Sequence, residues 1–590
     1  MTHTSRLQTG WRSERFRLVV VLLAALLGLA VLAPPVTAAA GDLVSVIVRE
    51  TPGSGNAPEL AVAGLGGSVT RQFEVIDAFV AEVPAGAVDL LAGHPEVAAV
   101  TPNGAVRLEA AGWDDATGLG SYNPNTFDGS MYRIAQSVVK ATDYWNAGYT
   151  GAGIDIALID SGVVPVQGLV HPGKVINGPD LSFESQAANL RYLDTFGHGT
   201  HMAGIMAGRD TNAAIGTSNT SQFLGIAPGS RIVNVKVADS QGATDVSQIL
   251  AAIDWVVQHR TDNGMNIRVM NLSFGTDGNQ SYLLDPLAFA VEQAWSAGVV
   301  VVVAAGNDGN SFALRNPASD PFVIAVGASE SGKAHTSISS VMDFSNCGTA
   351  LRSVDVVVPG KSIVSLRSPG SYADVHYPQA RVADRLFLGS GTSQAAAVVS
   401  GAAALVLSER PYATPDQVKA LLMDSASDLK KASTRCEGAG LINLGQVLGR
   451  PTPTAFQTHA PSVGTGSLEE SRGSNHVYDN GVALIGEQDI FGMPWDSASW
   501  SSLAAASASW SGGDWNGSTW TGASWSSSSW SGASWSSASW SGASWSGASW
   551  SSKSWSSASW SGASWSSASW SSASWSGASW SGNVWQGLSS

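Results

Sequence analysis

Three residue types that together support acyl transfer stand in this chain at the ends of segments that read as regular elements. Asp160 follows the apolar run 154–159, His198 stands in a glycine-framed turn that opens a helical stretch, and Ser393 begins a small-residue helix. A serine in the first turn of a helix lies beside free backbone N–H groups, which stabilise an anion forming on an attacked carbonyl. A histidine can take the proton of that hydroxyl, and an aspartate can orient the histidine. Taken alone, this segment would more simply predict that Thr392 or Ser393 caps a helix, but the three motifs together predict nucleophilic catalysis.

His201 is the alternative base, because it lies three residues after His198 and on nearly the same helical face. The other histidines of the chain lie in other segments or lack a glycine-framed helix start. No third ligand motif stands near this pair, so the two histidines do not indicate a metal site. We therefore predict His198 as the base, His201 as a supporting neighbour, and no metal in the chemistry.

These motifs, in the order Asp, His, Ser, resemble those of the subtilisin-like serine peptidases, the subtilases. The resemblance implies that Asp160 orients the base, that His198 is the general base and that Ser393 is the nucleophile. The segment 301–309 resembles the oxyanion segment of the family, which implies that the side-chain amide of Asn307 is a donor to the oxyanion. Such a peptidase needs no cofactor for its chemistry and acts on proteins or peptides.

The same resemblance implies two walls for the first substrate pocket. They comprise Ser273, Phe274, Gly275, Ala304, Ala305 and Gly306. Small walls beside an aromatic ring leave room for a large apolar side chain of the substrate, and the walls contain no acid that would select lysine or arginine. The chain departs from the family pattern at Gln394, Ala397 and Thr276, where methionine, proline and glycine are usual. These departures bear on the shape of the pocket rather than on catalysis.

We expect largely apolar, strand-like runs to position these site residues. The runs are 154–159, 232–237, 268–272, 299–304 and 323–326, and they alternate with helical stretches such as 246–258 and 286–297. Strands so apolar are covered on both faces, which predicts a parallel sheet between two helix layers. Active sites of such sheets lie at the C-terminal ends of strands, where Asp160 and Asn307 fall. The predicted fold is α/β, a subtilisin-like three-layer domain with a mostly parallel sheet over residues 129–449.

The first 110 residues read as two processed segments. Residues 1–40 combine arginines, an apolar run and small residues, which is typical of a secretory signal peptide; the run is short for the alternative, a membrane anchor that needs ~20 residues. Residues 41–110 alternate strands and helices and resemble inhibitor-type propeptides, which implies a small α+β domain that inhibits its own enzyme. A permanent small domain is the alternative. The connector 111–128 is rich in small and polar residues, so we place the maturation cut there.

The charge and cysteine content of the chain bear on its binding partners and on its disulfides. The formal net charge is −15, which argues against nucleic acid as the natural partner. Two cysteines, Cys347 and Cys436, either form one disulfide or remain two thiols. Subtilases commonly bind structural calcium, but Asp210 and Asn212, in the corresponding loop, are equally ordinary loop residues, so no metal ligand is assigned.

The C-terminal part changes character. Residues 450–466 read as a linker, 467–496 as a short mixed segment and 497–590 as a Trp/Ser/Gly tail, with tryptophan at every fifth position from Trp510 to Trp585. A square β-solenoid, which resembles pentapeptide-repeat proteins, and a flexible chain bearing aromatic side chains are the two alternatives. Exposed tryptophans stack on sugar rings, so the tail could tether the protein to cell-wall polysaccharide or an insoluble substrate; a self-associating spacer is the alternative.

The expected protein is thus a secreted, extracellular serine endopeptidase made as a self-processing zymogen, without a transmembrane span once the signal is removed. The alternative class is a surface adhesin in which the peptidase fold is inactive. The intact set of Asp160, His198, Ser393 and Asn307 argues against the adhesin. Labelling by a fluorophosphonate, which reacts with an activated serine, discriminates the two.

Overall fold

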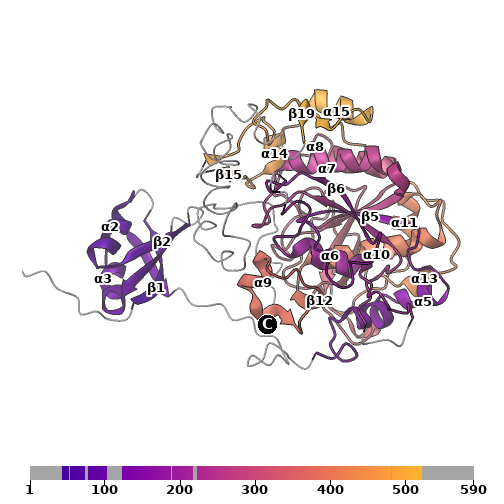
Figure 1. Cartoon of the computed structure of the whole chain (residues 1–590), viewed down its shortest axis with the longest axis horizontal. Coiled ribbons are helices and arrows are strands. Elements are labelled where there is room, and N and C mark those ends of the chain that lie inside the picture. Colours follow the sequence, from indigo (N-terminus) through magenta and orange to yellow (C-terminus); the bar gives the residue numbers. More distant parts are fainter. Residues whose placement is uncertain are drawn as a thin grey trace, which may run out of the picture. The chain divides into compact units, whose positions relative to one another are not determined.

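The computed structural model describes residues 43–51, 54–73, 78–102, 122–185, 187, 189–216, 222–479 and 482–520. The predicted signal peptide, residues 111–121 of the predicted connector and the tail beyond Trp520 lie outside the described residues. The chain divides into two compact units, Met1–Val106 and Arg107–Ser590, here termed the N-terminal unit and the main unit (Figure 1). No helix of the described residues is long and apolar enough to cross a membrane.

The N-terminal unit is a four-stranded antiparallel sheet with two α-helices, in the strand order β2-β3-β1-β4. Its elements are β1 (Leu43–Glu50), α2 (Ala57–Gly64), β2 (Ser68–Phe73), β3 (Ala78–Pro84), η2 (Ala85–Ala87), α3 (Val88–Ala92) and β4 (Val97–Pro102). Val48, Phe79 and Leu91 are fully buried in a core that belongs to this unit alone. The unit therefore has the α+β form that the sequence predicts.

A seven-stranded parallel sheet forms the centre of the main unit, in the order β11-β10-β9-β8-β5-β7-β6. The strands are β5 (Asp155–Asp160), β6 (Val175–Asp180), β7 (Arg231–Lys236), β8 (Ile267–Leu272), β9 (Val300–Ala304), β10 (Ile324–Ser329) and β11 (Val356–Pro359). Every residue of β5, β9 and β10 is buried, as apolar runs covered on both faces predict.

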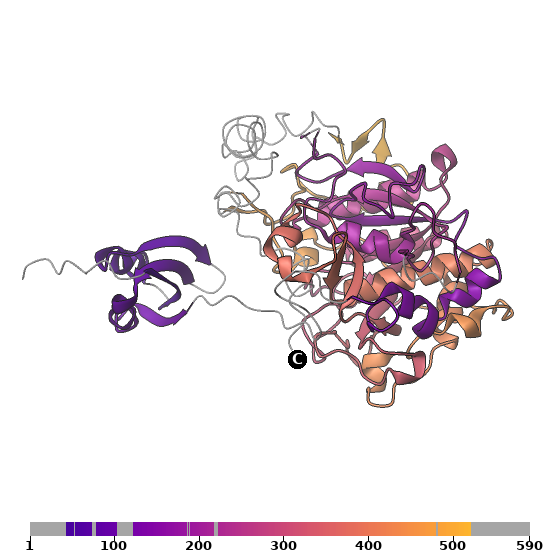
Figure 2. The ribbon, with the colours of Figure 1, turned by 60° about the horizontal axis from the view of Figure 1, so that its bottom comes forward.

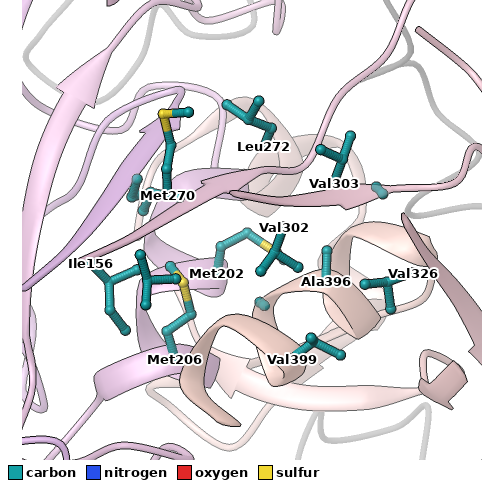
Figure 3. Close-up of a cluster of buried hydrophobic side chains, with 14 of the residues drawn as sticks. Ile156, Met202, Met206, Met270, Leu272, Val302, Val303, Val326, Ala396 and Val399 are labelled. Carbon is teal, nitrogen blue, oxygen red and sulfur yellow. The ribbon is translucent and has the colours of Figure 1, made fainter. Parts of the chain in front are cut away.

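Helices cover both faces of this sheet. In Figure 1, α7 (Val246–His259) and α8 (Pro286–Ser296) lie above it, whereas α6 (His198–Ala207) and α10 (Thr392–Glu409) lie below it. Figure 3 shows the core between the sheet and the lower helices, where Met202 and Met206 of α6 and Ala396 and Val399 of α10 meet side chains of the strands. The three-layer α/β fold predicted from the sequence is confirmed.

Shorter elements complete the main unit. They are α4 (Met131–Arg133), η3 (Ile134–Val138), α5 (Ala141–Asn146), η4 (Asp262–Gly264), η5 (His335–Ser337), β12 (Ile363–Leu366), α9 (Tyr372–His376), η6 (Pro378–Ala380), β13 (Arg381–Val382), β14 (Leu386–Gly389), α11 (Pro415–Asp424), α12 (Thr434–Glu437) and α13 (Leu444–Val447). A disulfide joins Cys347 to Cys436, with a Cα–Cα distance of 4.3 Å. The sequence had left this pairing open.

Residues 450–520 belong to the same compact unit as the sheet. They form α14 (Leu468–Arg472), β15 (Tyr478–Asp479), β16 (Val482–Ala483), α15 (Ser497–Ala505), β17 (Trp510–Ser511), β18 (Asp514–Trp515) and β19 (Ser518–Thr519). Of these elements, α14, α15 and β17 pack on α7 and α8, in the orange and yellow part of the main unit in Figures 1 and 2. The indole N–H groups of Trp500 and Trp515 both donate to Asp254 Oδ2, at 2.9 and 2.7 Å. In its described part the tail is therefore neither a solenoid side nor an exposed chain, because its first tryptophans are core residues.

Candidate active site

A buried aspartate and a buried histidine meet at the C-terminal edge of the sheet. Asp160 is the last residue of β5 and His198 the first of α6, and Nδ1 of the histidine lies 3.0 Å from each carboxylate oxygen. Both side chains are fully buried. A carboxylate can only accept, so it holds the proton on Nδ1 and leaves Nε2 as the nitrogen that takes up a proton. The contact is the one that an orienting acid and a general base require.

Ser393 lies in the first turn of α10 and is anchored to the end of the neighbouring strand β8. Its hydroxyl donates to the backbone oxygen of Ser273 at 3.0 Å, and the hydroxyl of Ser273 donates to the backbone oxygen of Ser393 at 3.3 Å. Because α10 packs against α6, the helix that carries the serine is adjacent to the helix that carries His198. Two residues predicted to share one site, Ser273 and Ser393, are thus in direct contact.

Asn307 follows β9 and contacts the turn that precedes Ser393. Its Oδ1 accepts from the backbone N–H of Thr392 at 2.9 Å and from the hydroxyl of Thr392 at 3.1 Å. The threonine hydroxyl in turn accepts from the N–H of Gly306 at 3.2 Å. Oδ1 is fixed in this way, and the amide nitrogen of Asn307 lies 3.4 Å from where a β-carbon of Gly391 would stand. The sequence analysis considered Thr392 only as a helix cap; the signal for its role here is its position directly before the serine.

The two predicted pocket walls are joined by a third segment. Thr276 and Asn316 exchange both backbone hydrogen bonds, at 2.9 and 3.0 Å, and the N–H of Arg315 donates to the oxygen of Ala305 at 3.1 Å. Most of the wall residues are buried: Ser273, Phe274, Ala304 and Ala305 are each at most 4% exposed. Phe274 belongs to the hydrophobic core.

The room expected for a large apolar side chain contains Arg315. A β-carbon at Gly275 would lie 2.5 Å from Arg315 Cβ, and one at Gly306 would lie 2.7 Å from Arg315 Cγ. The arginine stem therefore packs against the two glycines, one from each wall. The sequence-based expectation considered the walls alone, whereas tertiary contacts place the loop that carries Arg315.

His201, the alternative base, is fully buried one turn along α6. Burial, together with the nearby charge of His198, lowers the pKa of His201 to about 3. A ring with such a pKa stays neutral and is too weak a base to take a proton at neutral pH. His198, and not His201, contacts the carboxylate of Asp160 at the C-terminal edge of the sheet.

Asp194 holds the start of α6 and was missed in the sequence. Its Oδ1 accepts from the hydroxyl of Ser161 at 2.8 Å and from the N–H of Gly197 at 2.6 Å, and its Oδ2 accepts from the N–H of Thr200 at 2.7 Å. It thereby satisfies helix-terminal N–H groups on both sides of His198. An acid three residues before the glycine that starts a helix is the signal that could have identified it.

Gln394 follows the nucleophile and is fully buried. Neither atom of its amide has a hydrogen-bond partner among the described residues. Its Oε1 lies 2.9 Å from where a β-carbon of Gly391 would stand, beside the amide of Asn307. The departure from the family pattern at this position therefore places an unsatisfied polar group next to the serine.

The loop considered for calcium binds an arginine instead. Asp210 accepts from both terminal nitrogens of Arg385, at 2.8 and 2.7 Å, and from the N–H of Phe223 at 2.8 Å. A carboxylate engaged by a guanidinium in this bidentate manner does not fit a calcium ion, and Asn212 is exposed. Within the described residues, no group of three His, Cys, Asp or Glu side chains is placed to hold a metal ion.

A parallel α/β sheet with a paired aspartate and histidine at its C-terminal edge, and a serine at an adjacent helix start, defines a class of serine hydrolases. The sequence pattern of the subtilase family matches residues 151–440. Serine protease AprX of Bacillus subtilis is 36% identical over 305 residues, which cover 50% of this chain and 66% of that protein. Subtilisin of Bacillus pumilus is 36% identical over 316 residues (53% and 96%), and subtilisin NAT of Bacillus subtilis subsp. natto is 33% identical over 382 residues (64% and 82%). The chain belongs to the subtilase family and is a serine endopeptidase.

Proposed function

We propose that Asp160, His198 and Ser393 form the catalytic triad of a secreted endopeptidase made as a self-processing zymogen. The observation that carries this proposal is the buried contact of 3.0 Å between His198 Nδ1 and Asp160. Ser393 Oγ attacks the peptide carbonyl while His198 Nε2 takes its proton, and the same nitrogen returns the proton to the leaving amine. Asp160 holds the ring in the required tautomer and stabilises the imidazolium.

Asn307 and the backbone N–H of Ser393 hold the oxyanion in this mechanism. Support comes from Thr392, which occupies the amide oxygen of Asn307 and so directs the amide nitrogen to the substrate. The N–H of Ser393 belongs to the first turn of α10, where backbone donors have no partner within the helix. Fixed donors of this kind act on charge that develops in the transition state and cost no reorganisation.

Residues 41–110 are the inhibitory propeptide of this proposal, and the cut falls in the connector 111–128. Two features support it: the N-terminal unit has a core of its own, and the connector is rich in small and polar residues. The basic and apolar start of the chain supports export. The tryptophan period beyond Trp520 supports a tether to cell-wall polysaccharide or an insoluble substrate.

Sequencing the N-terminus of the exported protein tests secretion, self-cleavage and the nucleophile together. The wild type should begin within the connector and react with a fluorophosphonate, whereas Ser393→Ala should accumulate as an unlabelled precursor that retains residues 41–110. The control is Ser433→Ala, which changes an exposed serine that makes no cap bond at α12 and should mature normally. Self-maturation of Ser393→Ala in the absence of wild-type enzyme would falsify the assignment.

A further inference from the structure

Arg315 forms a floor between the two walls of the proposed substrate pocket. Its N–H donates to Ala305 at 3.1 Å, on one wall, and the next residue, Asn316, exchanges two hydrogen bonds with Thr276, at the end of the other wall. The backbone at 315–316 is therefore fixed to both walls. The position of the arginine follows from this pairing.

The stem of Arg315 fills the space that the two wall glycines leave. Its Cβ and Cγ lie 2.5 and 2.7 Å from where β-carbons of Gly275 and Gly306 would stand. These distances are shorter than any ordinary carbon contact, so the glycines are the residues that accommodate the stem. A bulky substrate side chain must displace the stem in order to enter between the walls.

The guanidinium is held by two carboxylates and is not free to swing away. Nε and Nη2 of Arg315 donate to the two oxygens of Asp308, at 2.7 and 2.5 Å, and Asp277 lies 3.7 Å from Nη1. Asp308 also accepts from Asn346 at 2.9 Å, and Asp277 accepts from the N–H of Ser474 at 2.7 Å. The side chain of Arg315 is 20% exposed, so the ion pair of Arg315 with Asp308 is partly accessible to solvent.

We propose that Arg315 restricts the substrate residue before the scissile bond to small uncharged side chains, such as those of glycine, alanine and serine. This inference rests on the proposed catalytic function. A large apolar side chain would have to move the stem and bury itself against a charged group. A cationic side chain meets the guanidinium as a like charge. An acidic substrate side chain is repelled as well, because the two carboxylates around the single guanidinium leave a local excess of negative charge.

Peptide substrates that differ only in the residue before the scissile bond test the inference. With the mature enzyme, we expect kcat/KM for alanine at least tenfold above that for phenylalanine, glutamate or lysine. Arg315→Ala should raise the ratio of phenylalanine to alanine cleavage at least tenfold, while Arg315→Lys, which keeps a long stem and a charge, should retain the wild-type preference. Arg450→Ala is the matched control, because it removes an exposed arginine whose side chain donates to the backbone oxygen of Asp424 rather than to a pocket loop.

The outcomes distinguish a failure of the proposed role of Arg315 from a failure of the proposed catalytic function. An enzyme that reacts with a fluorophosphonate but prefers phenylalanine, glutamate or lysine, or an Arg315→Ala variant with an unchanged ratio, overturns the role of Arg315 alone. An enzyme that cleaves no peptide and takes up no label overturns the proposed function instead. If Arg315→Ala does not fold, the wild-type enzyme is used to digest a denatured protein, and the residue before each cut bond is identified. A majority of large or charged residues at that position refutes the inference.

Discussion

The ion pair between Arg472 and Asp245 should contribute strongly to the attachment of the C-terminal segment. Nε and Nη2 of Arg472 donate to the Asp245 carboxylate at 2.7 and 3.3 Å, and both side chains are fully buried. Asp245 caps α7, and Arg472 also donates to the backbone oxygens of Gly486 and Gln488, at 2.8 and 2.6 Å. One side chain thus connects α14 to the sheet-covering helix α7 and to the segment that follows α14.

Arg472→Met keeps an apolar stem but leaves the Asp245 carboxylate buried without its cation. Removing one partner of a buried ion pair costs about 3–5 kcal/mol, because the remaining charge has lost both water and counter-charge. We expect the free energy of unfolding to fall by that amount. Urea unfolding followed by circular dichroism measures it, in the Ser393→Ala background so that self-digestion does not interfere. Arg435→Met, at an exposed site, should change the value by less than about 0.5 kcal/mol.

The pH dependence gives an independent check. Burial alone would raise the pKa of Asp245, but the charge and hydrogen bonds of Arg472 outweigh burial and hold that pKa below its usual value. A lowered pKa contributes stability above the unfolded value near 4, and this is lost only as the pH falls below about 4. In Arg472→Met burial raises the pKa of Asp245 instead, so the variant recovers stability as acid protonates it. The gap between the two proteins should narrow from pH 7 to pH 5; a loss under 1 kcal/mol, or a gap that widens on acidification, refutes the reasoning.

Three further predictions follow from other buried groups. Burial and repulsion from Asp320 raise the pKa of Glu292 to about 9, so its stabilising effect is complete below pH 4 and is lost as the pH rises toward 9; Glu292→Gln should flatten the fall in melting temperature between pH 6 and 9, and equal slopes would exclude this. Gln394→Met removes an unsatisfied buried amide and should stabilise the protein by about 1–3 kcal/mol in urea unfolding, where a lower midpoint contradicts the idea. Asn307→Ala should lower kcat about 10²–10³-fold with little change in KM, the cost that losing such a donor has in a subtilisin; a change in KM alone would assign Asn307 to substrate binding.

The local pattern of apolar residues was sufficient to predict the central strands of the sheet. The five consecutive valines 299–303 and the largely apolar run 154–159 predicted strands because a strand covered on both faces must be mostly apolar. The edge strands β6 and β11 were not predicted. β6 is mostly half-exposed and contains glycine and proline, and β11 has only four residues, so neither carries a long apolar signal.

The sequence by itself determined which residues could perform the chemistry, because Asp160, His198 and Ser393 each stand at the end of a regular element whose position short-range physics governs. It did not determine what surrounds them. The floor made by Arg315 and the pairing of Cys347 with Cys436 join residues far apart in the chain. The hydrogen bond between the buried Trp500 and Asp254 also joins residues far apart in the chain. Such contacts depend on complementarity of shape and charge between surfaces that meet only after folding, so only the tertiary structure decided them.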